Sequence, residues 1–133
     1  MSSGERLGVL DRHPLIVIDA ANVVGSVPDG WWRDRAGATE RLRDSLSTLA
    51  AHGLPEVGAP AEVVLVVEGK ARTVASTDTV RVVAAPGEGD DTVVDLVRAE
   101  AVRRPTVVVT ADRGLSERVR RLGARVLGPR SVY

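Results

Sequence analysis

The feature that most constrains the fold is a series of short, unbroken apolar runs rich in β-branched residues. The clearest are residues 15–18, 63–67 and 106–110, which read Leu-Ile-Val-Ile, Val-Val-Leu-Val-Val and Thr-Val-Val-Val-Thr. Their apolar character is continuous, whereas a strand with one face in water alternates between polar and apolar residues. Strands of this kind are buried on both faces, which is typical of a parallel sheet with helices packed on either side.

Segments with helical signals lie between these runs, so strands and helices alternate along the chain. This alternation predicts one α/β domain of three layers, with a central parallel sheet of about five strands flanked by helices. We expect the ends, residues 1–12 and 129–133, to be loosely held. The predicted helices are residues 32–51, 90–103 and 115–122, and the two further strands are residues 80–84 and 124–127.

Composition narrows the class of protein. The chain of 133 residues contains no cysteine, which excludes disulfides and thiolate metal sites. No apolar run approaches the roughly 18 residues of a membrane span, and the first ten residues lack a signal-peptide pattern, so we expect a cytoplasmic protein. The formal net charge is zero, yet 17 of the 18 basic residues are arginine. Arginine suits a phosphate partner, although a compositional bias of the source is the simpler explanation.

Carboxylates stand at the ends of the predicted strands. Asp19 and Glu68 end the first two strands, Asp90 and Asp91 follow the third, and Asp112 follows the fourth. Because ligands of open α/β sheets bind outside the carboxyl ends of the strands, we expect these side chains to converge. A single such Asp usually caps a helix, but a cluster of carboxylates needs a cation, and hard oxygen ligands suit Mg²⁺ or Mn²⁺.

At these residues the chain resembles the PIN-like superfamily, specifically its NYN branch and the YacP-like proteins within that branch. The segment Val17-Ile-Asp-Ala-Ala-Asn22 looks like the strand-one motif of the family, in which the Asp binds metal and the Asn orients the site. The segment Glu68-Gly-Lys-Ala71 is similar to the Asp-Gly-Lys segment of the related 5′-nucleases. Here a Glu, one methylene longer, replaces the Asp.

Two further motifs carry the resemblance, which spans about residues 15–129. Gly87-Glu-Gly-Asp-Asp91 looks like the Ala-Asp-Asp helix start of the family, with Gly89 in place of the Ala. Thr110-Ala-Asp-Arg113 is similar to the Thr-Ser-Asp segment, with Ala111 in place of the Ser. The resemblance implies a PIN-like fold and the cleavage of RNA more than of DNA.

The residues and the resemblance together predict the site. Between the two adjacent carboxylates we favour Asp91 as the ligand and Asp90 as the helix cap, although the two roles can be exchanged. Trp31 and Trp32 follow the first strand, where one of them can stack on a base, but packing is the more frequent fate. The predicted catalytic residues are Asp19, Asp91 and Asp112, and the predicted metal ligands are Asp19, Glu68, Asp90, Asp91 and Asp112. The predicted substrate-binding residues are Asn22, Lys70, Arg72, Asp95, Thr110, Arg113 and Ser116.

We therefore expect a metal-dependent endoribonuclease that acts on structured or ribosome-associated RNA. A haloacid-type phosphatase is disfavoured, because the position two residues after Asp19 is Ala21. Three alternatives stay open. The first is an RNA-binding module with a decayed site, which Glu68 and the zero net charge suggest. The others are a small nucleotide phosphohydrolase and a non-enzymatic partner protein of a toxin–antitoxin or ribosome-associated complex. The sequence does not fix an oligomeric state.

Overall fold

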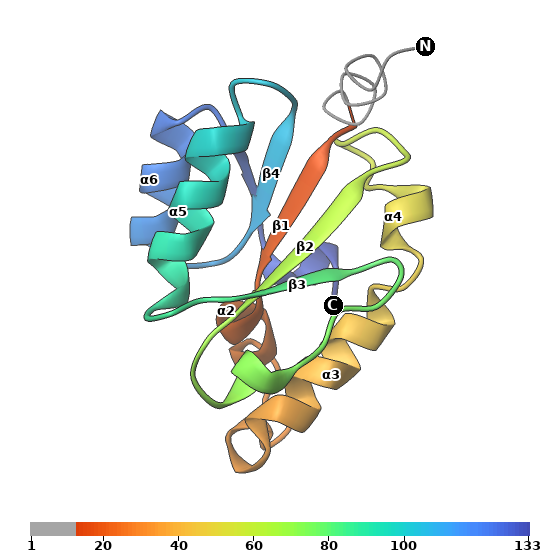
Figure 1. Ribbon diagram of the computed structural model, residues 1–133, viewed down its shortest axis with the longest axis vertical. Helices are drawn as coiled ribbons and strands as arrows, with labels where there is room; N and C mark the ends of the chain where they lie inside the picture. The colour runs from red at the N-terminus through yellow and green to blue at the C-terminus, as the bar shows by residue number, and fades with distance from the viewer. Residues whose placement is uncertain (1–12) are drawn as a thin grey trace.

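A computed structural model describes residues 13–133, in which five strands form one sheet between two layers of helices (Figure 1). The strands are hydrogen-bonded in the order β3-β2-β1-β4-β5, and every neighbouring pair is parallel. The predicted three-layer α/β fold with a parallel five-stranded sheet is therefore confirmed. The strands are β1 (Leu15–Asp19), β2 (Glu62–Val67), β3 (Arg81–Ala84), β4 (Thr106–Val109) and β5 (Arg125–Leu127).

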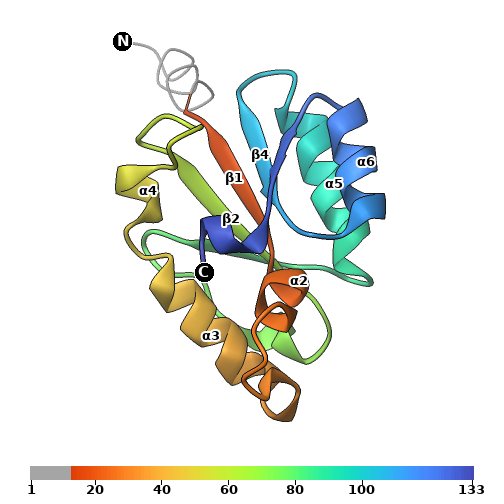
Figure 2. The ribbon, with the colours of Figure 1, turned by 180° about the vertical axis from the view of Figure 1, so that it is seen from behind.

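The helices divide between the two faces of the sheet. Helices α5 and α6 cover one face, and α2, α3 and α4 lie on the other side (Figures 1 and 2). Alternate residues of β1 serve the two cores, since Leu15 packs toward α5 and α6 while Ile16 packs toward α2 and α3. The helices are α2 (Ala20–Gly25), α3 (Arg35–Ser45), α4 (Leu49–His52), α5 (Gly89–Glu100) and α6 (Arg113–Arg121). Three short 3₁₀ helices are η1 (Trp31–Arg33), η2 (Gly69–Thr73) and η3 (Pro129–Ser131).

Two local expectations are wrong. The single helix expected over residues 32–51 is divided into η1, α3 and α4. Asp34 starts α3 by accepting a hydrogen bond from the Gly37 amide, and the Ser45 hydroxyl donates to the Leu42 carbonyl oxygen at 2.6 Å near the end of α3. The carboxyl terminus, expected to be loose, forms η3, in which Pro129 is buried, and Val132 after it packs against the core. The other end that was expected to be loose, residues 1–12, lies outside the described residues.

The strand order fixes where a ligand is expected. Strands β2 and β3 lie on one side of β1, and β4 and β5 lie on the other, so the order reverses between β1 and β4. Ligands of open α/β sheets bind at such a switch point, outside the carboxyl ends of the strands. Helix α2 begins directly after β1 at this edge of the sheet (Figure 2).

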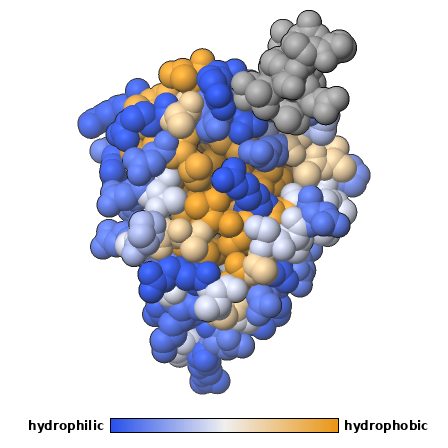
Figure 3. Space-filling model, viewed as in Figure 1, coloured by the Kyte–Doolittle hydropathy of each residue, from blue (hydrophilic) through white to orange (hydrophobic). Residues whose placement is uncertain are grey.

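Part of the surface at the edge strand β3 is apolar (Figure 3). Figure 3 shows apolar surface across the middle of the face where the edge strand β3 runs, surrounded by polar residues. Val82 and Val83 of β3 are half-buried, and the strand is only four residues long. A short edge strand of this kind limits pairing with other chains. Within residues 13–133, no helix is long and apolar enough to cross a membrane.

Candidate active site

Asp19 is the last residue of β1 and lies at the switch point of the sheet. Asp19 is only 5% exposed, and its Oδ2 accepts a hydrogen bond of 3.0 Å from the Thr110 hydroxyl. Thr110 is buried and directly follows β4. The Oδ1 atom of Asp19 faces the amide nitrogen of Asn22 at 3.5 Å and caps α2. Two adjacent strands and the first turn of a helix therefore fix this carboxylate in place.

The environment of Asp19 disfavours its ionised form. Burial raises the pKa of its carboxyl group from the ordinary 3.8 to about 6. The hydrogen bonds from Thr110 and Asn22 lower the pKa, but they offset burial only in part, and the negative charges of Asp90 and Glu68 raise it further. A cation placed among these groups would reverse the balance, because it favours the ionised form of each carboxylate.

Four carboxylates line one open pocket at this edge. The pocket has a volume of about 260 Å³, and Asp19, Glu68, Asp90 and Asp112 lie around it together with Asn22. They come from the ends of β1 and β2 and from the starts of α5 and α6. The predicted convergence of these side chains is confirmed for these four carboxylates, while their role as ligands stays a prediction.

The electrostatics of Asp90 reflect this crowding. Burial raises the pKa of its carboxyl group, and the negative charges of Asp112, Glu68 and Glu88 raise it further, while Arg118 lowers it in part. Two of these negative charges are carboxylates of the same pocket. The pocket is therefore a region where negative charges repel one another and a divalent cation would be stabilised.

The segment after β4 is held by polar contacts that also orient the pocket. The backbone amide of Ala111 donates to Asn22 Oδ1 at 2.7 Å, and the amide of Asp112 donates to the Thr110 hydroxyl at 3.1 Å. Asp112 Oδ1 in turn accepts a hydrogen bond of 2.9 Å from the amide of Leu115, so this residue caps α6 and lines the pocket at once. The two interpretations of Asp112, cap and site residue, are compatible.

Glu68 and Gly89 fit each other. A Cβ atom built on Gly89 would lie 2.9 Å from Glu68 Oε1, a distance that requires one of the two residues to shift. The longer Glu side chain therefore occupies the space that a side chain at position 89 would fill. The two departures from the family motifs, Glu for Asp and Gly for Ala, are thus in direct contact.

No family model matches the sequence, and no curated protein matches it. Among solved structures, the chain is similar to Rae1 (YacP) from Bacillus subtilis, with a TM-score of 0.67 and 16% identity over 88% of this chain and 70% of that chain. A mutant of the same protein gives a TM-score of 0.66 and 16% identity over 90% of this chain and 72% of that chain. The chain shares the fold of Rae1 (YacP). The resemblance to YacP-like proteins is confirmed at the level of the fold.

The structure reverses the expected order of the acidic pair on α5. Asp90 lies in the pocket, whereas Asp91 points outward, with its side chain 73% exposed and paired with Arg118 at 3.1 Å. Neighbouring helical residues are about 100° apart around the axis, so only one of the two can face the pocket. Asp90 is not the cap either, since Glu88 occupies that position without a side-chain capping bond.

Asp95 is exposed, as Asp91 is, and does not line the pocket. Residues four apart share one face of a helix, so the outward direction of Asp91 applies to Asp95 as well. Its side chain is 76% exposed and paired with Arg98 at 3.1 Å. The register of α5 therefore places Asp91 and Asp95 outside the pocket, while their predicted roles in catalysis and substrate binding stay predictions.

Among the other predicted substrate contacts, Asn22 lines the acidic pocket, whereas Lys70, Arg72, Arg113 and Ser116 do not. Lys70 and Arg72 are exposed on η2, and Arg72 donates to the backbone oxygen atoms of Gly69 at 3.1 Å and Pro86 at 3.4 Å. A separate surface hollow is lined by Arg113, Ser116 and Thr110. The Thr110 hydroxyl also donates the hydrogen bond to Asp19. Their contacts with substrate stay predictions.

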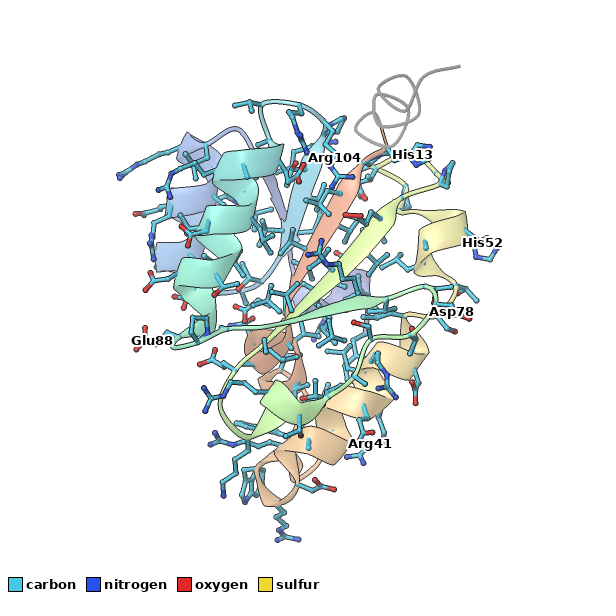
Figure 4. All side chains as sticks on the ribbon, viewed as in Figure 1. His13, Arg41, His52, Asp78, Glu88 and Arg104 are labelled. Atoms are coloured by element: carbon cyan, nitrogen blue, oxygen red, sulfur yellow. The ribbon has the colours of Figure 1, made fainter. Side chains whose placement is uncertain are left out.

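Two of these side chains are already engaged within the protein. The Ser116 hydroxyl donates to the Asp112 carbonyl oxygen at 2.7 Å, and the Asn22 side chain holds the Ala111 amide. The histidines are remote, because His13 precedes the amino end of β1 and His52 lies on α4 (Figure 4). Sequence reasoning missed Gly89 and Arg118, whose contacts with Glu68 and Asp91 depend on tertiary packing.

The donor set fits a magnesium or manganese ion in its chemistry. All four acidic side chains offer hard oxygen atoms, and Mg²⁺ takes only one or two carboxylates directly while keeping several waters. Within residues 13–133, no three Asp, Glu or His side chains already lie close enough together to hold a metal ion directly. Direct binding of an ion by three of these side chains would therefore require them to move closer together, with water filling the remaining ligand positions.

Proposed function

We propose that the chain is a metal-dependent endoribonuclease, which hydrolyses phosphodiester bonds of RNA with Mg²⁺ or Mn²⁺. The observation that carries this proposal is the pocket at the switch point, where Asp19, Glu68, Asp90 and Asp112 come together from four elements. The fold shared with Rae1 (YacP) and the strand-end motifs of the PIN-like family support the same function.

Within this proposal, the four carboxylates would hold the cation, directly or through water, and Thr110 keeps Asp19 aligned. A bound divalent cation supplies a water of lowered pKa and stabilises charge on the phosphate. This space is surrounded by Asp19, Glu68, Asp90, Asp112, Asn22 and Ala21, so no Ser, Cys or His from the described part of the chain lines it. Water is then the expected nucleophile, and the chain's own task is to position the cation and the substrate.

The substrate contacts belong to the surrounding surface. Lys70 and Arg72 extend from η2, which begins directly after Glu68, and they are suited to the sugar-phosphate backbone. Arg113 stands at the start of α6, directly after Asp112, and lines a neighbouring hollow, where it is suited to a second phosphate. The proposal includes RNA as the partner and a cytoplasmic location, with structured or ribosome-associated RNA as the intended substrate class.

The test compares matched substitutions in an RNA cleavage assay. Purified protein is incubated with labelled structured and single-stranded RNA in Mg²⁺, in Mn²⁺ and in chelator. Asp19→Asn and Asp90→Asn are expected to lower the cleavage rate by more than the roughly 100-fold that loss of an outer-shell partner costs. Asp95→Asn is the control, because it makes the same chemical change on α5 outside the pocket.

Each contrary outcome indicates a specific alternative. Cleavage by Asp19→Asn at the wild-type rate means that the metal assignment is wrong. Retention of RNA without cation-dependent cleavage indicates an RNA-binding module. Hydrolysis of nucleoside triphosphates in place of RNA indicates a nucleotide phosphohydrolase.

A further inference from the structure

A second, largely apolar pocket adjoins the acidic one. It has a volume of about 160 Å³ and lies between α2, η1, α3 and η2. Ala21 and Glu68 line both pockets, so the two share a wall. Val24 and Ala71 supply apolar surface, and the proposed ribonuclease chemistry leaves this space without a role.

Two flat groups border this pocket. Trp31 is half-buried, and its ring packs near Gly25, where a built Cβ would lie 3.6 Å from a ring carbon. The guanidinium carbon of Arg35 lies 5.4 Å from the centroid of the Trp31 ring. An indole and a guanidinium group both stack on flat, conjugated rings, which makes this pocket suited to a nucleobase.

The guanidinium group of Arg35 carries N–H donors that can bind a ligand. Within residues 13–133, it contacts the face of Trp31 but forms no hydrogen bond or ion pair. A guanidinium carries five N–H donors and no acceptor, so it favours a ligand with carbonyl or anionic oxygen atoms. An apolar hollow bordered by an aromatic ring and by free donors selects a flat ring that bears carbonyl oxygen.

We propose that this pocket is a nucleobase subsite that takes the pyrimidine of the nucleotide beside the scissile phosphate. This inference rests on the proposed ribonuclease function. The pocket volume of about 160 Å³ is close to the roughly 150 Å³ of a protein cavity that binds one benzene ring, so a single six-membered ring fits, and we expect the larger purine to bind less well. Arg35 donates to the base carbonyl, and the wall formed by Glu68 places the next phosphate at the acidic pocket.

The two tryptophans of the chain provide a direct test. Trp32→Phe leaves Trp31 as the only indole, and Trp31→Phe leaves Trp32, which is 57% exposed and does not line the pocket. Each variant is titrated with uridine or adenosine in chelator while tryptophan fluorescence is recorded. These nucleosides carry no phosphate, so neither cleavage nor charge at the acidic pocket contributes.

Uridine is expected to quench Trp31 saturably in the Trp32→Phe variant and to leave Trp32 emission unchanged in the Trp31→Phe variant. In the Trp32→Phe background, Arg35→Gln is expected to weaken uridine binding about fivefold, which corresponds to about 1 kcal/mol for one hydrogen bond. Arg33→Gln is the matched control, because Arg33 lies over the other ring, with its guanidinium carbon 5.8 Å from the Trp32 centroid. Thermal melting checks that every variant is folded.

The proposal is overturned if uridine does not quench Trp31 saturably, if adenosine binds as tightly, or if Arg33→Gln weakens binding as much as Arg35→Gln. The result also separates the two proposals. Uridine binding by a protein that does not cut RNA supports the subsite and removes the ribonuclease. RNA cleavage without uridine binding removes the subsite and leaves the ribonuclease.

Discussion

Replacing Asp19 with Asn is expected to stabilise the metal-free protein at neutral and alkaline pH. Burial, together with the charges of Asp90 and Glu68, raises the pKa of Asp19 from 3.8 to about 6. One pKa unit corresponds to about 1.36 kcal/mol, so the folded state loses about 3 kcal/mol when this carboxylate ionises. Asn has nearly the same shape and no charge, and its amide oxygen can still accept the Thr110 hydroxyl hydrogen bond.

The pH dependence has a definite sign. The folded state binds the Asp19 proton more tightly than the unfolded chain does, so the stabilising contribution is complete below pH 3.8. It declines as the pH rises and is lost once the pH passes the folded-state pKa of about 6. Allowing up to about 1.5 kcal/mol for a weaker hydrogen bond to Asn, the net gain at pH 8 is roughly 1.5 to 3 kcal/mol.

Thermal unfolding followed by circular dichroism in chelator measures this gain. For a domain of this size, 1 kcal/mol shifts the melting temperature by about 4 °C, so Asp19→Asn should melt about 6 to 12 °C above wild type at pH 8. The difference should disappear near pH 4. Asp95→Asn, on an exposed side chain, is the control and should melt like wild type. A variant that melts below wild type at pH 8, or by the same margin at both pH values, would refute the reasoning.

Three further substitutions test the contacts around the pocket and the core. Gly89→Ala would place a Cβ 2.9 Å from Glu68 Oε1, so it should weaken Mn²⁺ binding about tenfold in calorimetry. The double variant Gly89→Ala/Glu68→Asp should restore binding, because the Asp side chain is shorter. Failure to restore it would contradict the fit between Gly89 and Glu68. Thr110→Val leaves Asp19 Oδ2 and the Asp112 amide without their hydroxyl partner, and urea unfolding should show a loss of about 1 to 3 kcal/mol; an unchanged midpoint would mean that water replaces the hydroxyl. Arg104→Met removes a side chain that is 7% exposed and bonded to Glu62 and Glu100, so unfolding in urea should show a loss of about 3 kcal/mol, and a gain would mean that the ion pairs are dispensable.

The sequence predicted the sheet because its signals are local. Each run of β-branched residues is long enough to form a buried strand, and a parallel sheet brings all carboxyl ends to one edge. That reasoning placed Asp19, Glu68 and Asp112 together without knowledge of the strand order. The order itself, with β1 and β4 adjacent, depends on tertiary packing, yet it is what brings Thr110 to Asp19.

The misplacement of residues at the site has its physical origin in helix register. A shift of one residue turns a side chain by about 100°, so the choice between Asp90 and Asp91 depends on how α5 sits against the sheet. The motif alone contains no information on that angle. The same is true of Arg35, whose position over Trp31 follows from the start of α3 after its Asp34 cap. Patterns of residue type predict which elements form, while packing decides which faces meet.

The most direct measurement is X-ray diffraction from crystals soaked in Mn²⁺, with the anomalous signal of the ion used to locate it. The account predicts a manganese peak between the side chains of Asp19, Glu68, Asp90 and Asp112, and no such peak in crystals of the Asp19→Asn variant. The account would be contradicted if, at saturating Mn²⁺, this space stays empty or the ion binds elsewhere on the protein.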